Sequence, residues 1–272
     1  MMNDDLAFTA GLMSVTFRDS EIHEIVDLAC RAGLESISWA GDAHVPTGDL
    51  DQANRARAAC AAAGIRIESF GSYWKAIDST FTPVLETARA LGAGRIRVWT
   101  GKTGSRAIDS AARQAITRRL ADAADEAADL GIGLHLEFHP HTLTDSAPST
   151  RALLDEIAEL RTDARLPVAT YWQPRPGITV PEAIGEIAFL GSRISSLHVF
   201  SWDANGSRLA LKEHREAWLQ YLKTLMRHPP TAPFEQRREL LLEFVRSDSR
   251  QQLLDDASEL RRWIELISRV AP

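Results

Sequence analysis

Cysteine is scarce in this chain, with only Cys30 and Cys60 among 272 residues. Both fall on Ala-rich helical patterns, where a free cysteine behaves as a small buried hydrophobe. Their spacing is not that of a metal-binding pair, which excludes a metal site built on cysteines. This usage favours the reducing environment of the cytoplasm.

Long apolar runs and positive charge are also scarce. No apolar stretch approaches the length of a membrane-spanning helix, and the N-terminal Met-Met-Asn-Asp-Asp is acidic where a secretory signal is basic and then apolar. The net charge is -6, and the basic residues are scattered through the predicted helices. These features argue against a membrane or a nucleic acid as a partner.

Low-complexity linkers are absent as well, so we expect a single domain over residues 1–272. The composition is that of a soluble globular protein, with 44% hydrophobic and 25% charged residues. A chain of this length can bury a sizeable core in one large α/β domain.

The first half of the chain repeats one pattern, in which a helical segment ends at a glycine and a short β-rich run follows. The glycines are Gly33, Gly64, Gly92 and Gly131, separated by 31, 28 and 39 residues. Glycine can adopt the left-handed conformation that ends a helix, and this spacing is typical of successive βα units. We predict a first helix over about 20–32 and strands over 8–17, 35–39, 66–70, 95–99 and 133–137.

The second half continues the alternation with weaker punctuation. We predict strands over 166–173, 194–202 and 239–245, a loop over 227–234, and helices over 150–160 (with Ser149 as its N-cap), 181–190, 213–226 and 251–267. Eight strands that alternate with helices predict a parallel sheet, which closes most naturally into a (β/α)8 TIM barrel. The alternative is a doubly wound open sheet, although no Gly-x-Gly-x-x-Gly motif follows the first strand.

Polar and aromatic residues gather where the predicted strands end, which is where such barrels carry their active sites. Strand alternation turns His135, Glu137 and His139 to one side and the apolar residues between them to the other. Five tryptophans near strand ends predict an aromatic-walled pocket that stacks on sugar faces: Trp39, Trp74, Trp99, Trp172 and Trp202. Other side chains at these ends are Asp42, His44, Asp49, Glu68, Tyr73, Arg97, Gln173, Arg175, His198, Arg246 and Asp248.

Glu137 and Glu243 form the most specific pair. Each follows an apolar run and precedes a Phe, and a carboxylate in that pattern is costly unless it lines a wet or metal-filled pocket. With the fifth and eighth strands on opposite sides of a barrel, the two carboxylates would face each other and move a proton onto and off a substrate. They would also suit a divalent ion with His198 as a nitrogen ligand. The structural alternative is an ion pair with Arg97, Arg175 or Arg246.

Nearly the whole chain resembles the sugar phosphate isomerase/epimerase family, the xylose isomerase-like TIM barrels. The segments that carry the resemblance are 39–46, 96–101, 136–139, 142–145, 171–174, 197–200 and 242–245. The family implies a divalent cation (Mn, Mg, Co or Zn) held by Glu, Asp, His and Glu from the fifth to the eighth strand. It also implies two glutamates that shuttle a proton at the carbon next to a carbonyl, and Glu137 and Glu243 match these.

The chain departs from the family pattern at three places. Trp172 or Gln173 replaces the Asp of the sixth strand, and only Gln173 offers a metal an oxygen. Phe200 stands where family members often carry the second His of His-x-His, which leaves His198 as the nitrogen ligand. Ser38 stands where a Glu is expected. A site with less negative charge binds its ion more weakly, so metal dependence stays open.

The resemblance implies an isomerase or epimerase of a small keto-sugar, sugar phosphate or related polyol ketone, with Glu137 and Glu243 as the acid/base pair. A divalent ion, where present, would polarise the carbonyl within a shell completed by Gln173 and His198. The expected substrate contacts are His44, Trp99, His139, Arg175 and Arg246.

Two alternatives come from other classes of function. A dehydratase of the inosose type would use the same glutamates to remove water, and a barrel without chemistry would only bind a sugar-like ligand. An endonuclease is disfavoured by the acidic charge balance and by the lack of the extra histidines of a multi-zinc site. A homo-oligomer is left open.

Overall fold

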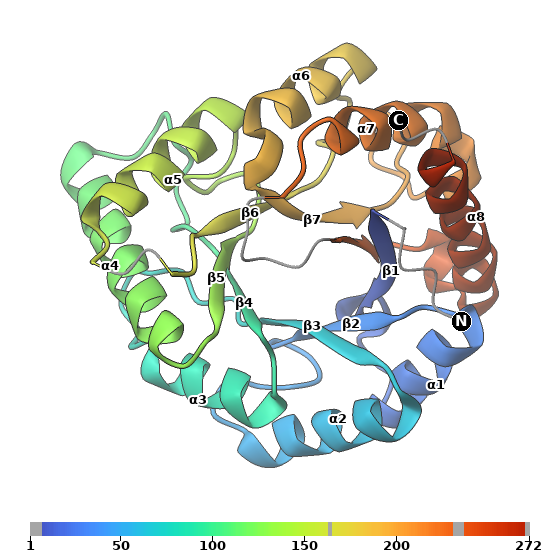
Figure 1. Cartoon of the computed structure of the whole chain (residues 1–272), viewed down its shortest axis with the longest axis horizontal. Helices are drawn as coiled ribbons and strands as arrows, with labels where there is room; N and C mark the ends of the chain where they lie inside the picture. The colour runs from blue at the N-terminus through green and yellow to red at the C-terminus, as the bar shows by residue number, and fades with distance from the viewer. Residues whose placement is uncertain (1–6, 163–164, 231–236, 270–272) are drawn as a thin grey trace.

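The strands close into a parallel barrel that follows the order of the chain. They are β1 (Phe8–Met13), β2 (Ser36–Ala40), β3 (Arg66–Gly71), β4 (Arg95–Val98), β5 (Gly133–Leu136), β6 (Ala169–Trp172), β7 (Ile194–Val199) and β8 (Arg238–Leu242). Each is hydrogen-bonded to its neighbours in sequence, and β1 closes the ring against β8 (Figure 1). The structure, a computed structural model, describes residues 7–162, 165–230 and 237–269. The predicted (β/α)8 barrel is confirmed, and the open sheet is excluded.

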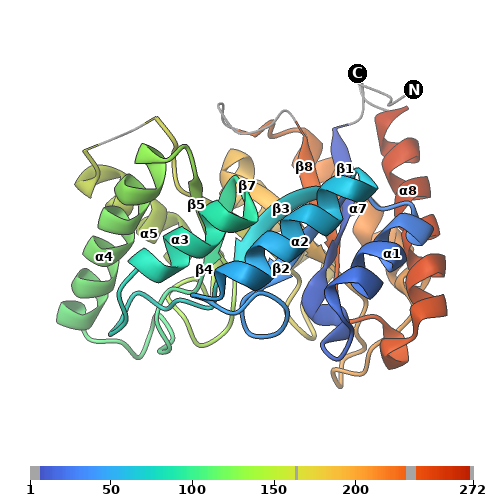
Figure 2. The ribbon, with the colours of Figure 1, turned by 90° about the horizontal axis from the view of Figure 1, so that it is seen from below.

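The helices form a ring around the barrel (Figure 1). They are α1 (Ile22–Ala32), α2 (Leu50–Ala63), α3 (Thr82–Leu91), α4 (Ser110–Asp129), α5 (Ala147–Leu160), α6 (Val180–Leu190), α7 (Arg215–Met226) and α8 (Arg250–Ser268), with short 3-10 helices η1 (Ser14–Phe17), η2 (Gly191–Arg193), η3 (Leu211–His214) and η4 (Arg246–Asp248). Figure 2 shows the start of β1 and the end of α8 at the same end of the barrel. Within the described ranges, no helix has the length and apolar character needed to cross a membrane.

Three of the predicted glycines end helices in the left-handed conformation. Gly33, Gly64 and Gly92 follow α1, α2 and α3 with φ angles of 64°, 68° and 75°. Their backbone N–H groups donate to carbonyls of the last helical turn, which helical hydrogen bonds leave unpaired. Gly131, with a φ of 71°, follows α4 after one further residue, Leu130.

The first predicted strand is too long. β1 ends at Met13, and residues 14–17 turn into η1. The Ser14 hydroxyl favours this turn, because it accepts a hydrogen bond from the backbone N–H of Ala40 at the end of β2 (2.9 Å). Thr16 and its neighbours in η1 therefore reach the mouth of the barrel.

The strands β4 to β8 also end before the predicted ones do. Glu137 and Glu243 are consequently the first residues after β5 and β8. Each stays tied to a neighbouring strand, because the Glu137 N–H donates to the carbonyl of Val98 (3.0 Å) and the Glu243 N–H to that of Val199 (3.1 Å). The two glutamates thus hold equivalent positions at the carboxyl end of the barrel.

The helix α5 begins at Ala147, earlier than predicted, and Ser146 rather than Ser149 precedes it. Pro148 lies in its first turn, where a missing N–H does no harm. The Ser149 hydroxyl instead donates to the carbonyl of Leu143 (2.7 Å). The predicted loop over 227–234 lies partly outside the described residues.

The apolar core lies between the outer face of the barrel and the helices. Trp172 is fully buried there against Trp218 and Tyr221 of α7, with ring centroids 6.3 and 5.5 Å away. Cys60 on α2 is buried as predicted, but Cys30 on α1 is exposed. The buried residues of α1 form a stripe along one face of the helix. Position 30 lies outside this stripe, so Cys30 faces solvent.

The inside of the barrel is polar below the level of Glu137 and Glu243. Glu239 accepts hydrogen bonds there from Arg66 (2.7 Å) and Ser36 (2.8 Å). Glu68, which the sequence placed among the site residues, accepts from Arg95 (3.1 Å) and from the hydroxyl of Tyr171 (2.7 Å). Glu68 points into the barrel and not into the cavity above it, because it sits in mid-strand with its carboxylate fully buried.

Candidate active site

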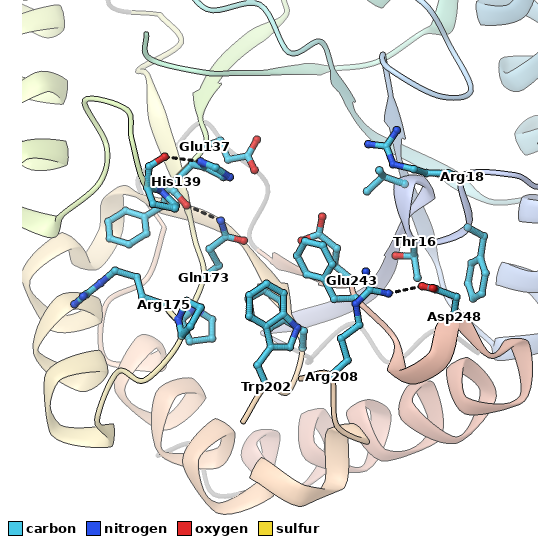
Figure 3. A pocket seen from close by; sticks show the side chains of 18 of the residues that line it. Thr16, Arg18, Glu137, His139, Gln173, Arg175, Trp202, Arg208, Glu243 and Asp248 are labelled. Atoms are coloured by element: carbon cyan, nitrogen blue, oxygen red, sulfur yellow. Dashed lines mark hydrogen bonds and ion pairs between the residues drawn. The ribbon is translucent and has the colours of Figure 1, made fainter. Parts of the chain in front are cut away.

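A cavity of about 600 Å³ opens at the carboxyl ends of the strands. Its lining comes from the segments that follow β1 and β3 to β8, so the cavity lies over the centre of the barrel. Figure 3 shows Glu137 and Glu243 projecting into the same open space. The volume lies in the range of small-molecule sites.

Glu137 is held by a cation. Its carboxylate accepts a hydrogen bond from the guanidinium of Arg97 on β4, and only 7% of the Glu137 side chain and 3% of the Arg97 side chain are exposed. Burial by itself lowers the pKa of Arg97, but the neighbouring Glu137, Tyr73, Tyr171 and Glu243 raise it, and the net direction is upward. Arg97 is therefore a permanent cation. One of the ion pairs named above as the structural alternative does form, although Glu137 still lines the cavity.

Glu243 has different neighbours. Its Oε2 lies 3.2 Å from Nδ1 of His198, a fully buried residue of β7. The same Nδ1 lies 3.1 Å from Oε1 of Gln173, whose amide nitrogen donates to the carbonyl of Phe138 (2.7 Å). Among the described residues, neither Glu243 Oε2 nor His198 Nε2 has a hydrogen-bond partner. A buried polar atom without a partner is uncommon in folded proteins, and here it leaves Glu243 ready to bond a bound molecule.

The ring of strands corrects the expected placement of the two glutamates. In an eight-stranded barrel that follows chain order, β4 stands opposite β8, whereas β5 and β8 have only β6 and β7 between them. Glu137 and Glu243 therefore lie closer together around the barrel than the predicted placement on opposite sides. Arg97 reaches Glu137 from β4, the strand that stands across the barrel from β8.

Aromatic rings line two parts of the cavity. The rings of Trp99 and His139 pack together with their centroids 4.1 Å apart and their planes tilted by 31°. Trp202 and Phe244 lie 4.9 Å apart in a second cluster, and the guanidinium of Arg208 sits 5.3 Å from the centroid of Phe244. All five residues line the cavity, and Figure 3 shows His139 and Trp202 at separate places on its wall. The predicted aromatic pocket thus exists in part.

Three of the five predicted wall tryptophans lie elsewhere. Trp39 and Trp172 are fully buried because alternation along β2 and β6 turns them outward, towards the helices. Trp74 packs against Phe81 (4.9 Å between centroids), and its indole N–H donates to the carbonyl of Ser79 (3.1 Å).

Left-handed backbone at residues other than glycine is concentrated around the cavity. Tyr73, Phe244 and Asp248 line it and have φ angles of 56°, 51° and 48°. Such conformations cost free energy and are typical of functional sites. Phe244 directly follows Glu243, so its turn helps to set where that carboxylate points. Burial raises the pKa of Tyr73 to about 12, so its phenol stays protonated and can donate a hydrogen bond.

Of the five predicted substrate contacts, Trp99, His139 and Arg175 line the cavity, whereas His44 and Arg246 do not. The imidazole of His44 bonds the Ser14 hydroxyl (3.0 Å) and the Phe17 carbonyl (3.2 Å), so it braces η1. Burial lowers the pKa of His44.

Arg246 turns away from the cavity in η4. It pairs with Glu213 (3.4 Å) and donates to Gln252 of α8 (2.7 Å). The left-handed Ser247 and Asp248 reverse the chain after Arg246 and bring Asp248, not Arg246, to the lining.

The prediction missed several lining residues. Thr16 and Arg18 were not predicted to line the site, because they lie in or beside a strand that was predicted too long. The polar run Arg18-Asp19-Ser20 after that strand could have indicated that a loop at the site begins there. Arg208 lies in a loop without periodicity, and a bridge to Trp202 returns it to the cavity. Arg208 and Asp248 form an ion pair there (Figure 3).

The side chains predicted to hold a divalent ion do not fit one in this arrangement. The carboxylate of Glu137 is already bonded to Arg97, and Oε1 of Gln173 faces Nδ1 of His198. Throughout residues 7–162, 165–230 and 237–269, no three His, Cys, Asp or Glu side chains gather in a way that could hold a metal ion. Metal ligands have to be free and deprotonated. Of the predicted four, Glu243 Oε2 and His198 Nε2 have no partner among the described residues, but His198 does not line the cavity, so only Glu243 offers a free ligand atom there.

No protein-family model and no curated protein matches the sequence. Solved structures do share its fold. A probable 3-DHS dehydratase from Bacillus anthracis, AsbF, involved in petrobactin synthesis, is 18% identical with a TM-score of 0.72, over 93% of this chain and 99% of that one. The D-psicose 3-epimerase of Clostridium cellulolyticum H10, solved with D-tagatose, is 13% identical with a TM-score of 0.69, over 96% of this chain and 99% of that one.

A xylose isomerase-like TIM barrel protein from Mycobacterium smegmatis, solved in complex with magnesium, is also similar. It is 15% identical with a TM-score of 0.65, over 97% of both chains. At these identities the likeness concerns the fold, and the chain has the fold of the xylose isomerase-like TIM barrels. The resemblance inferred from the sequence is thus confirmed at the level of the fold.

Proposed function

We propose that the protein transfers a proton at the carbon next to a carbonyl group of a small sugar-like molecule, as an isomerase or an epimerase. One observation carries the proposal. Two buried glutamates, Glu137 and Glu243, line one cavity and have opposite kinds of neighbour, a guanidinium for Glu137 and an imidazole for Glu243. Carboxylates placed in different environments can take different proton-transfer roles.

Glu243 is the proton acceptor in this proposal, because its Oε2 is buried and has no hydrogen-bond partner within the described residues. Glu243 then returns this proton to the neighbouring carbon, while the carboxylate of Glu137, paired with Arg97, accepts the proton of the substrate hydroxyl and passes it to the other oxygen. The protonated phenol of Tyr73 lies in the same lining and would donate a hydrogen bond to the oxygen that becomes an enolate. General acid–base catalysis of this kind contributes about 10²–10⁴-fold in rate.

The lining favours an uncharged keto-sugar over a sugar phosphate. The rings of Trp99 and Trp202 offer apolar faces for a sugar to stack on. The arginines of the rim already face carboxylates: Arg18 with Asp42, Arg175 with Glu186, Arg208 with Asp248 and Arg250 with Glu24. A phosphate would have to compete with these carboxylates for the same donors.

The proposal is tested by incubating the protein in deuterium oxide with a panel of ketoses, ketose phosphates and cyclic polyol ketones. Mass spectrometry and proton NMR then report a deuterium at the carbon next to the carbonyl, an isomer of unchanged mass, or the loss of water. We expect exchange and an isomer with wild type, and loss of both in Glu243→Gln. The exposed Glu213→Gln is the matched control.

Two outcomes would change the proposal. Loss of water would identify a dehydratase, which begins with the same proton removal. Binding of a sugar without any exchange would identify a barrel that binds a ligand and does no chemistry.

A further inference from the structure

A guanidinium bonds one of the two carboxylates to which the family resemblance assigns a metal ion. The resemblance assigns a divalent cation to a site between the glutamates of the fifth and eighth strands. In this chain Arg97 bonds Glu137, and Glu137 and, to a smaller extent, Glu243 raise the pKa of Arg97. Its guanidinium carbon lies 5.8 Å from the ring centroid of Tyr73 and 5.9 Å from that of Tyr171. One bonded carboxylate and two aromatic rings therefore border this buried cation.

The barrel makes room for this guanidinium at Gly71. Gly71 of β3 pairs in register with Arg97 of β4. A Cβ on Gly71 would overlap Nη2 of Arg97 far inside van der Waals contact. The missing side chain is what allows Arg97 to fold against β3 and face Glu137.

Arg97 is not a surface residue that happens to reach the site. It is 2% exposed, and its Nε and Nη2 have no hydrogen-bond partner among the described residues. A cation buried to this degree requires compensating negative charge, which the bonded carboxylate of Glu137 supplies. A divalent ion at the same carboxylates would repel the guanidinium and would take away its compensation.

We infer that Arg97 takes the place of the divalent cation in this barrel, so that the site works without a metal ion. Arg97 acts through Glu137, as a residue that positions it and balances its charge. The part of the inference that concerns the reaction rests on the proposed function. The part that concerns metal binding does not.

The test measures Mn²⁺ binding to the full chain by isothermal titration calorimetry and by the electron paramagnetic resonance signal of free Mn²⁺. The variants are Arg97→Met, which keeps the bulk and removes the charge, Arg97→Lys, which keeps the charge, and Arg97→Met/Glu137→Gln. Thermal unfolding shows which of them are folded. No substrate is needed, so the result is independent of whether the proposed reaction is found.

We expect no saturable Mn²⁺ site in wild type or Arg97→Lys. Arg97→Met is expected to gain a site that binds Mn²⁺ at least tenfold more tightly than the wild-type chain does. Adding Glu137→Gln is expected to abolish this site. One Mn²⁺ per wild-type chain, lost in Glu243→Gln, would overturn the inference even if Arg97→Met failed to fold. A folded Arg97→Met that binds no better than wild type would overturn it too, because Arg97 would not be what occupies the place.

On a substrate found by the deuterium screen, the wild-type rate is expected to be unchanged by EDTA. The rate–pH profile is expected to move in Arg97→Met and to return towards wild type in Arg97→Lys. A rate that falls on chelation and recovers with Mn²⁺ would contradict the inference. Equal rate–pH profiles for Arg97→Met and Arg97→Lys would show that the charge of Arg97 has no part in the reaction and that its role is structural.

Discussion

The Nδ1 of His198 lies 3.2 Å from a carboxylate oxygen of Glu243 and 3.1 Å from Oε1 of Gln173. Both neighbours are acceptors, so the proton of the neutral imidazole belongs on Nδ1. The amide nitrogen of Gln173 is in turn fixed by the carbonyl of Phe138. A chain of contacts from the end of β5 through β6 and β7 therefore holds the imidazole of His198 beside Glu243.

Replacing His198 should affect turnover more than affinity. His198 does not line the cavity, so His198→Phe removes the orientation of Glu243 without removing a substrate contact. We expect kcat to fall about 10²-fold, the loss typical of a reacting group displaced by about 1 Å, with KM nearly constant. Steady-state kinetics on the substrate from the exchange screen measures this. His214→Gln serves as control, since His214 bonds Ser201 outside this cavity, and an equal loss there would remove His198 from the mechanism.

Gly71 should not tolerate a methyl group. In Gly71→Ala the new Cβ forces the guanidinium of Arg97 to move and so breaks its bond to Glu137. We expect a loss of about 1–3 kcal/mol in unfolding free energy from overpacking, together with a lower kcat. Gly94→Ala is the matched control, because a Cβ at Gly94 would meet open space. Wild-type kcat and stability in Gly71→Ala would show that the guanidinium can shift without consequence.

Alternation and helix-ending glycines could predict the barrel, and the apolar-Glu-Phe pattern could predict Glu137 and Glu243. These are properties of neighbouring residues along the chain. The partner of Glu137 was named in the sequence only as one of three arginines. Choosing Arg97 requires the register of β3, β4 and β5, which no local pattern encodes.

Errors in the predicted site come from strand alternation and from where a strand ends. A shift of one residue along a strand reverses the direction of a side chain. Trp172 was placed on the wall of the cavity, whereas it follows the inward Tyr171 and so faces the helices. Thr16 was hidden in a strand that in fact ends at Met13. Arg246 was expected at the site, but the left-handed Ser247 turns the chain and leaves Arg246 outside.

The hydroxyl of Tyr171 should stabilise the interior of the barrel. It donates to both carboxylate oxygens of Glu68, at 2.7 and 3.0 Å, in a fully buried setting. Hydrogen bonds to charged groups contribute about 1.5–3 kcal/mol, so Tyr171→Phe should lower the unfolding free energy by that amount in a denaturant titration. Tyr221→Phe, at a ring that packs against Trp172 and Trp218, is expected to lower it less. Equal effects would mean that the loss reflects packing and not the bond to Glu68.

His135 should make the fold sensitive to acid. It is fully buried in β5, where its Nδ1 lies 2.7 Å from the Ser195 hydroxyl, and burial, with a contribution from Arg95, lowers its pKa well below the ordinary 6.5. Below pH 6.5 the unfolded chain therefore binds a proton that the folded chain does not. The unfolded state then binds more protons, so the unfolding free energy falls as the pH falls through this range.

One such group changes the stability by at most about 1.4 kcal/mol per pH unit. We expect His135→Gln to remove up to this much from the slope of unfolding free energy between pH 6.5 and 5, measured by urea titration at several pH values. His23→Gln should keep the wild-type slope, because His23 is exposed on α1 and folding does not bury it. If both variants keep the wild-type slope, His135 takes up its proton in the folded barrel as readily as in the unfolded chain. The acid sensitivity would then have to come from other groups.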